Sequence, residues 1–261
     1  MVTELAGTEP WRPRVLRAAG PLARVALVQS RASLLGGDDV SLAIDLDAGC
    51  ALEILELGAT VGHHARGGPP ARLSSRVRLG PDARLVWLGE PLIAAAGCNV
   101  LRSTRIELGA GACVLLGEAL VLGRVGEEPG RARALTQITF DGRPAVEETL
   151  DTDPAWLLRS SVVAGGAGMI SALTLVGRRD PDPPPGALQA HEPATLWRSV
   201  EPARTGPGDA GAGLAQRWRD LVLGDGRRAP GIAQAGATVS YLRRLSGNQP
   251  PPSATRARSS A

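Results

Sequence analysis

Apolar residues fall on every second position in three segments of the chain, residues 44–52, 77–85 and 106–114. This alternation sends side chains to one face of a β-strand. Within each segment, a step of small or turn-forming residues interrupts the alternation and lets the chain double back. These steps are Ala48-Gly49, Pro81-Asp82 and Ala110-Gly111. Each segment therefore predicts a strand, a tight turn and a second strand.

The three segments recur at intervals of 33 and then 29 residues, measured between their first residues. Repetition at about 20 to 50 residues is typical of architectures in which each repeat covers the apolar face of its neighbour. The sequence predicts a mainly β fold with layered or stacked antiparallel and mixed sheets. This fold is a β-sandwich or is β-helix-like, and it has one or two short helices.

Turn signals and other periodic segments extend this picture. Gly36, Gly37 and Asp38 predict a turn before the first repeat, because Gly accepts positive φ and Asp bonds nearby amides. Asp141 and Gly142 predict the turn of a hairpin. Its strands are expected at residues 134–140 and 144–150, a short helix at 151–159, and further strands on both sides of residues 165–168.

A helix is expected at about residues 212–223, where Leu214, Trp218 and Leu221 share one face. We expect a β-rich domain at residues 1–180 and a Pro-rich extended segment at 181–210. A helical C-terminal part should follow at 211–246, and a disordered tail at 247–261.

All 29 basic residues are arginine, and the sequence contains no lysine. This excludes a P-loop, a pyridoxal Schiff base and protein-kinase chemistry, each of which requires a lysine. The formal net charge is +3, and only 3% of the residues are aromatic. Nucleic-acid binding is therefore not expected, since single-strand binders place aromatic side chains beside a basic groove.

The three cysteines, Cys50, Cys98 and Cys113, form no C-x-x-C pair. In the strand repeats a cysteine is by default a small buried apolar residue, and a reducing compartment fits best. The chain has no uninterrupted apolar run of 18 residues and no signal-peptide pattern near its first residues. We expect a soluble, cytoplasmic protein that does not associate with membranes.

Two pairs of residues are candidates for metal chemistry. His63 and His64 are adjacent in a Gly-rich loop and could ligate nickel, copper or zinc transiently, although an exposed polar loop explains them as well. Glu90 and Glu118 each follow the end of a repeat. If the repeats stack, these carboxylates line a rim or polar passage that a divalent cation can follow; the alternative is two ordinary solvated charges.

Several blocks of residues, in a fixed order and spacing, resemble the UreD (UreH) family of urease accessory proteins. They are Gly36-Gly37-Asp38, residues 77–85 with Trp87-Leu88, residues 105–112, Gly117-Glu118 with Leu122-Gly123-Arg124, and Asp141-Gly142-Arg143-Pro144 with Glu147 or Glu148. The resemblance implies a non-enzymatic, β-rich scaffold. Its implied partners are apo-urease and the accessory proteins F and G, and its implied role is nickel insertion.

The resemblance implies transient nickel and no tightly bound cofactor. We therefore expect a chaperone of urease maturation without catalytic residues. Two alternatives stay open at this point. One is a β-structured binding or structural protein with no metal role, and the other is a metal-dependent hydrolase that uses His63 and His64.

Overall fold

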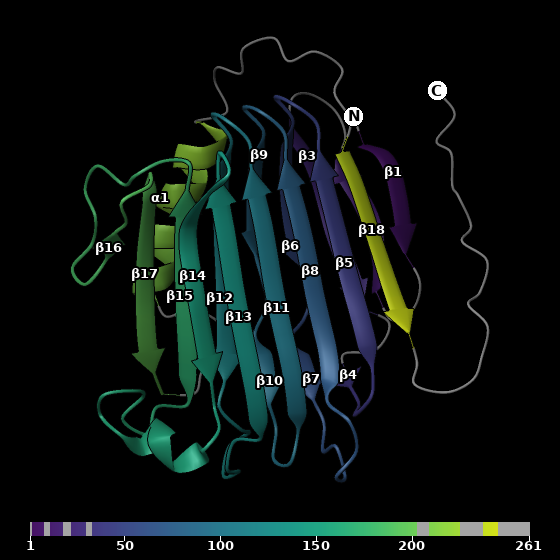
Figure 1. The fold of residues 1–261 in the computed structure, drawn as a ribbon, viewed down its shortest axis with the longest axis vertical. Helices are drawn as coiled ribbons and strands as arrows, with labels where there is room; N and C mark the ends of the chain where they lie inside the picture. The colour runs from purple at the N-terminus through teal and green to yellow at the C-terminus, as the bar shows by residue number, and fades with distance from the viewer. Residues whose placement is uncertain are drawn as a thin grey trace.

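The computed structural model describes the chain at residues 2–7, 11–17, 22–29, 33–202, 209–224 and 237–244. Over these residues, two β-sheets face each other and an α-helix lies beside one of them (Figure 1). The predicted fold class, mainly β with stacked sheets, is confirmed.

The seven-stranded sheet and the eleven-stranded sheet enclose the main apolar core. In order across the sheet, the seven-stranded sheet contains β1 (Val2–Gly7), β18 (Ala237–Arg244), β5 (Asp39–Leu46), β8 (Ala71–Leu79), β11 (Asn99–Leu108), β13 (Arg131–Phe140) and β14 (Arg143–Asp151). The main path of the eleven-stranded sheet contains β16 (Leu188–Gln189), β17 (Ala194–Glu201), β15 (Met169–Val176), β12 (Cys113–Val121), β9 (Arg84–Leu88), β6 (Ala51–Glu56), β3 (Leu22–Gln29) and β2 (Trp11–Arg17). Three short strands branch from β12, namely β10 (Leu92–Ala94), β7 (Thr60–Gly62) and β4 (Ser33–Leu34).

The chain crosses from one sheet to the other in each repeat. Strands β5, β8 and β11 lie parallel and adjacent in the seven-stranded sheet. Strands β6, β9 and β12, which follow them in sequence, lie parallel and adjacent in the eleven-stranded sheet. Each repeat is thus one coil of a β-helix, and the coils stack along one axis as the periodicity predicts.

The repeats stack in register. Ile44 of β5 lies beside Val77 of β8, which lies beside Ile106 of β11, and Ile138 of β13 continues the row. We call these four residues the aliphatic layer; each is at most 1% exposed. Full burial of one such side chain contributes roughly 1.5–3 kcal/mol, so this layer is a major source of stability.

The tight turns between the two sheets also stack. Gly49, Asp82 and Gly111 occupy the same place in the three repeats and have φ values of 71°, 57° and 70°. Asp tolerates the left-handed region better than most residues with a side chain, which explains how the second repeat manages without glycine. The Gly49 amide donates to the Pro81 carbonyl at 2.8 Å and binds one turn to the next.

Parallel stacking ends at β13. Asp141 and Gly142 both have positive φ, 48° and 74°, and β14 then returns antiparallel to β13, which confirms the predicted hairpin. At the other end, Gly36 and Gly37 form the turn before β5. The Asp38 carboxylate closes this turn by accepting the Leu35 amide at 2.8 Å.

Two local predictions between residues 151 and 176 were only partly right. A short 3-10 helix, Ala155–Arg159, stands where a helix was expected at 151–159. Strand β15 follows residues 165–168, but turns rather than a strand precede them. The amides of Val163, Ala164 and Gly165 all donate to the Ser160 carbonyl, so this stretch closes into turns and cannot extend as a strand.

Strands occupy parts of the chain for which none was predicted. Strands β16 and β17 lie within the expected Pro-rich extended segment, and β17 pairs with β15 along its full length. Strand β18 lies within the expected helical part and pairs antiparallel with β5. The tail predicted to be disordered, residues 247–261, lies outside the described residues.

The helix predicted near residues 212–223 is confirmed as α1 (Asp209–Leu223). It lies against β9, β12 and β15, on the face of the eleven-stranded sheet that points away from the seven-stranded sheet (Figure 1). Trp218 is fully buried there and packs in one apolar cluster with Leu214 and Leu115. Within the described ranges, no helix has both the length and the apolar character needed to cross a membrane.

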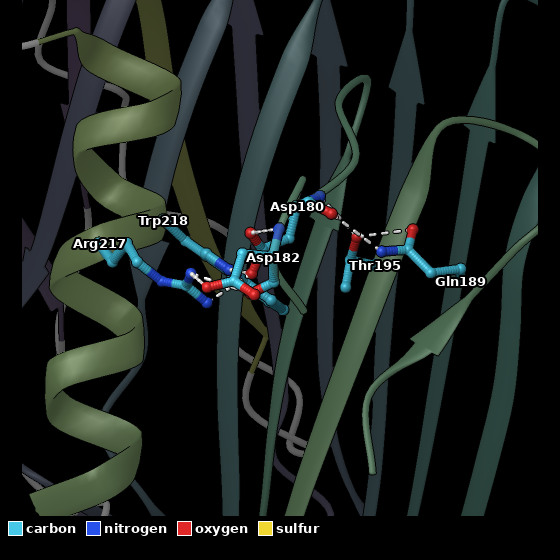
Figure 2. Close-up of polar contacts among 6 residues, drawn as sticks. All are labelled: Asp180, Asp182, Gln189, Thr195, Arg217 and Trp218. Carbon is cyan, nitrogen blue, oxygen red and sulfur yellow. Dashed lines mark hydrogen bonds and ion pairs between the residues drawn. The ribbon is translucent and has the colours of Figure 1, made fainter. Parts of the chain in front are cut away.

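A buried carboxylate anchors α1 to the sheet. Asp180 Oδ2 accepts hydrogen bonds from Trp218 Nε1 at 2.7 Å and Arg217 Nη2 at 2.6 Å (Figure 2). The Asp180 backbone amide donates to Thr195 Oγ1 of β17 at 2.9 Å. A buried charge is costly unless it is paired, so displacement of α1 would leave Asp180 without its partners. These bonds therefore set the position of the helix on the sheet.

Candidate functional site

A row of polar side chains crosses the interior beside the aliphatic layer. It lies two residues earlier on the same strands, so its side chains also point inward. Its members on the seven-stranded sheet are Ser75, Thr104, Thr136 and Glu148, in adjacent register on β8, β11, β13 and β14. Thr104 and Thr136 are 3% and 8% exposed.

The facing eleven-stranded sheet contributes charged side chains to the same level. Glu118 of β12 is level with Ala172 of β15 and Arg198 of β17. Glu56 ends β6 on the other side of β9, where Gly89 follows the strand. The polar layer is defined here as Ser75, Thr104, Thr136 and Glu148 of one sheet, Glu56, Glu118 and Arg198 of the other, and Arg102 of β11.

Glu118 lies at the centre of the polar layer. Its Oε1 accepts a hydrogen bond from Thr104 Oγ1 at 3.0 Å, and its Oε2 accepts one from Thr136 Oγ1 at 2.7 Å. Arg102 Nη2 lies 3.5 Å from Oε1. One carboxylate from the eleven-stranded sheet is therefore held by two hydroxyls and one cation from the seven-stranded sheet.

Glu56 is held differently. Its Oε1 accepts a hydrogen bond from Trp87 Nε1 at 2.8 Å, and its Oε2 accepts one from the Glu90 amide at 3.0 Å. Desolvation raises the pKa of Glu56 to about 7, and these hydrogen bonds oppose the shift without cancelling it. Glu56 can therefore gain or lose a proton near neutral pH.

Two cavities of the polar layer share lining residues. One has a volume of about 50 Å³ and is lined by residues that include Glu56, Glu90 and Ser75. The other has a volume of about 30 Å³ and is lined by residues that include Glu148 and Arg198. Both are lined by Arg102 and Glu118. Each is large enough for water or a small ion. Apolar side chains such as Leu42 and Leu120 also line the cavities, so the charged and hydroxyl groups are the polar partners available to an occupant.

An ion pair between Glu148 and Arg198 joins the two sheets at the second cavity. The Arg198 side chain is 46% exposed, so this end of the polar layer approaches solvent. At the first cavity, Glu90 is exposed. The polar layer thus approaches solvent at Arg198, and the first cavity approaches it at Glu90, whereas Thr104 and Thr136 beside Glu118 are buried.

The two glutamates that the sequence singled out line the same cavity, but they differ in position. Glu118 lies inside the layer, whereas Glu90 is exposed and its backbone amide supports Glu56. The sequence analysis missed Glu56, although a signal was present. Measured from the first residue of each repeat, Glu56 and Glu118 occupy the same position, and Gly89 occupies it in the second repeat.

The two histidines have separate partners. His63 Nε2 lies 3.2 Å from Ser33 Oγ, and His64 Nδ1 accepts the Arg66 amide at 2.8 Å. His64 pairs through its backbone with Cys98, whose thiol pKa is raised to about 11 by burial. The described part of the chain contains no group of three or more His, Cys, Asp or Glu residues able to hold a metal. A metal role for the histidine pair stays a prediction.

Fold and site define a stacked-β scaffold with charged and hydroxyl side chains between its two sheets. A family model described as UreD urease accessory protein matches residues 3–229. The chain therefore belongs to the UreD urease accessory protein family, as the resemblance in its sequence predicted.

Two similar proteins support this assignment. Urease accessory protein UreD 1 of Streptomyces griseus subsp. griseus is 38% identical over 173 residues, which cover 66% of this chain and 67% of the relative. Urease accessory protein UreD of Streptomyces coelicolor is 34% identical over 201 residues, which cover 76% of this chain and 79% of the relative.

Proposed function

We propose that this protein is a non-enzymatic scaffold needed for nickel insertion into apo-urease. In this proposal it acts in a complex with apo-urease and the accessory proteins F and G. Nickel is cargo that passes through the protein, and no cofactor is tightly bound. Family membership supports the accessory role, and the polar layer supports a route for the metal.

The observation that carries this proposal is the position of Glu118 between two cavities. Carboxylate and hydroxyl oxygens hold a borderline cation such as Ni²⁺ less tightly than a cage of imidazole and thiolate would. An ion that must be released benefits from such weak, successive ligands. Glu56, Glu118 and Glu148 supply carboxylates along the layer, and Ser75, Thr104 and Thr136 supply hydroxyls.

The test replaces Glu118 by glutamine in cells that make urease subunits and the F and G proteins, with this chain as the sole UreD. We expect the nickel content and activity of urease to fall on the order of tenfold, the scale of losing a metal-site contact. Co-purification with urease and with F and G should be unchanged. The urease apoprotein itself should remain abundant.

Glu107→Gln is the matched control. Glu107 makes the same kind of carboxylate-to-arginine contact, 3.3 Å to Arg78, but its side chain is 61% exposed on β11. Normal nickel loading in Glu118→Gln would refute the passage through the polar layer. Absence of any association with urease components would refute the accessory role and favour a binding protein with no metal function.

A further inference from the structure

Arg102 is a permanent cation in the middle of the polar layer. It extends inward from β11, its side chain is only 14% exposed, and it lines both cavities together with Glu118. Arginine stays protonated at any physiological pH, so its charge cannot be switched off by titration. A route for a divalent cation that contains a fixed positive charge requires an explanation.

The hold of Arg102 on Glu118 is loose. The shortest nitrogen-to-oxygen distance between the two side chains is 3.5 Å, which is long for a charge-assisted contact of a guanidinium with a carboxylate. The two shorter contacts of Glu118 go to threonine hydroxyls. Arg102 Nε is buried and has no hydrogen-bond partner within the described ranges of the chain. A guanidinium bound this weakly can leave the carboxylate without breaking a network of bonds.

We propose that Arg102 occupies the cation position at Glu118 at rest and so limits how long a divalent cation is retained there. This inference rests on the proposed passage of nickel. Its chemical basis is competition: a dication and the guanidinium both seek the same carboxylate, and each lowers the affinity of Glu118 for the other. Arg102 thereby keeps Glu118 a point of transfer rather than a trap.

The test measures Ni²⁺ binding directly by calorimetric titration of the full-length protein at pH 8. Arg102→Gln should bind Ni²⁺ more tightly than wild type, by tenfold or more on the order-of-magnitude scale of a lost like-charge interaction. Arg102→Lys, which keeps the charge, should resemble wild type. The gain should disappear in the double variant Arg102→Gln with Glu118→Gln, which locates it at Glu118.

Arg102→Met removes the same charge and places a side chain suited to apolar neighbours there. If Arg102→Gln does not fold, the same Ni²⁺ titration is made with Arg102→Met. Equal Ni²⁺ affinity in wild type and in both uncharged variants would overturn the inference. The proposed function is judged separately. If Glu118→Gln abolishes nickel loading of urease while the Arg102 variants bind Ni²⁺ no more tightly, only the proposed role of Arg102 is refuted. If urease is loaded normally with Glu118→Gln, nickel passage through the polar layer is refuted, and the role of Arg102 is refuted with it.

Discussion

The aliphatic layer and the polar layer lie side by side in one interior, and on β8, β11 and β13 they share the same strands, register and inward direction. On these three strands they differ in the residues that occupy the inward positions. The aliphatic layer stabilises the protein because burial of its side chains removes apolar surface from water. The polar layer works against stability, because its charged groups lose their hydration on folding. Only hydrogen bonds and ion pairs with neighbouring side chains offset that cost. One β-helix thus provides a rigid frame and, two residues away on β8, β11 and β13, a set of inward polar groups.

The largest expected effect on stability comes from the aliphatic layer. Ile106→Ala should lower the free energy of unfolding by about 2–5 kcal/mol, because it removes buried methyl groups between two neighbouring coils. Chemical denaturation followed by circular dichroism measures this change. The conservative variant Ile106→Val should cost only about 0.5–1.5 kcal/mol. A loss below 1 kcal/mol for alanine would mean that the layer is not tightly packed.

A smaller effect is expected from the hydroxyls that hold Glu118. The double variant Thr104→Val with Thr136→Val keeps side-chain shape but removes both donors, and should destabilise the protein by about 1–3 kcal/mol. The cause is a carboxylate left without its partners, so the same valines should be nearly neutral in a Glu118→Leu background. Denaturation of all the variants completes this thermodynamic cycle. Equal costs in both backgrounds would show that the hydroxyls do not act through Glu118.

The charge state of Glu56 should make the stability of the polar layer depend on pH. Its pKa in the folded protein is about 7, above the value of 4.5 expected in the unfolded chain. The folded state therefore binds the proton more tightly, and this contribution to stability is lost as the pH rises from about 4.5 to about 7. Relative to Glu56→Gln, wild type should lose roughly 1–3 kcal/mol across this interval.

Denaturation of wild type and Glu56→Gln at pH 5, 6, 7 and 8 measures this difference. Ile54 on the same strand gives the matched contrast, since an Ile54→Val variant changes the apolar core without a titrating group. Its stability should follow the pH dependence of wild type. Parallel curves for wild type and Glu56→Gln would contradict the raised pKa.

The same contrast between layers explains how far the sequence could predict the structure. Alternating apolar residues fixed the strands and the intervals of the repeats fixed their stacking, because the aliphatic layer is encoded by residue type and spacing. Polar residues are assigned to a face less directly. Glu107 lies between the inward residues Ile106 and Leu108, so alternation places it outward. Glu118 belongs to β12, which packs apolar residues on both faces, so alternation alone does not show which face it takes. The Pro-rich run before β16 also made strand β17 hard to predict, because β17 pairs with β15 through residues 18 to 32 positions apart in the sequence.

The smallest effect is expected where the polar layer does not contact Glu118. Ser75 lines the first cavity from β8, level with Thr104, but the hydroxyls that bind Glu118 belong to Thr104 and Thr136. Ser75→Ala should therefore change the free energy of unfolding by no more than about 0.5 kcal/mol. Nickel loading of urease, measured as for Glu118→Gln, should stay close to wild type. Loading that fell as far as in Glu118→Gln would show that the passage depends on every hydroxyl along the cavity, and that Glu118 and its two threonines are not its centre.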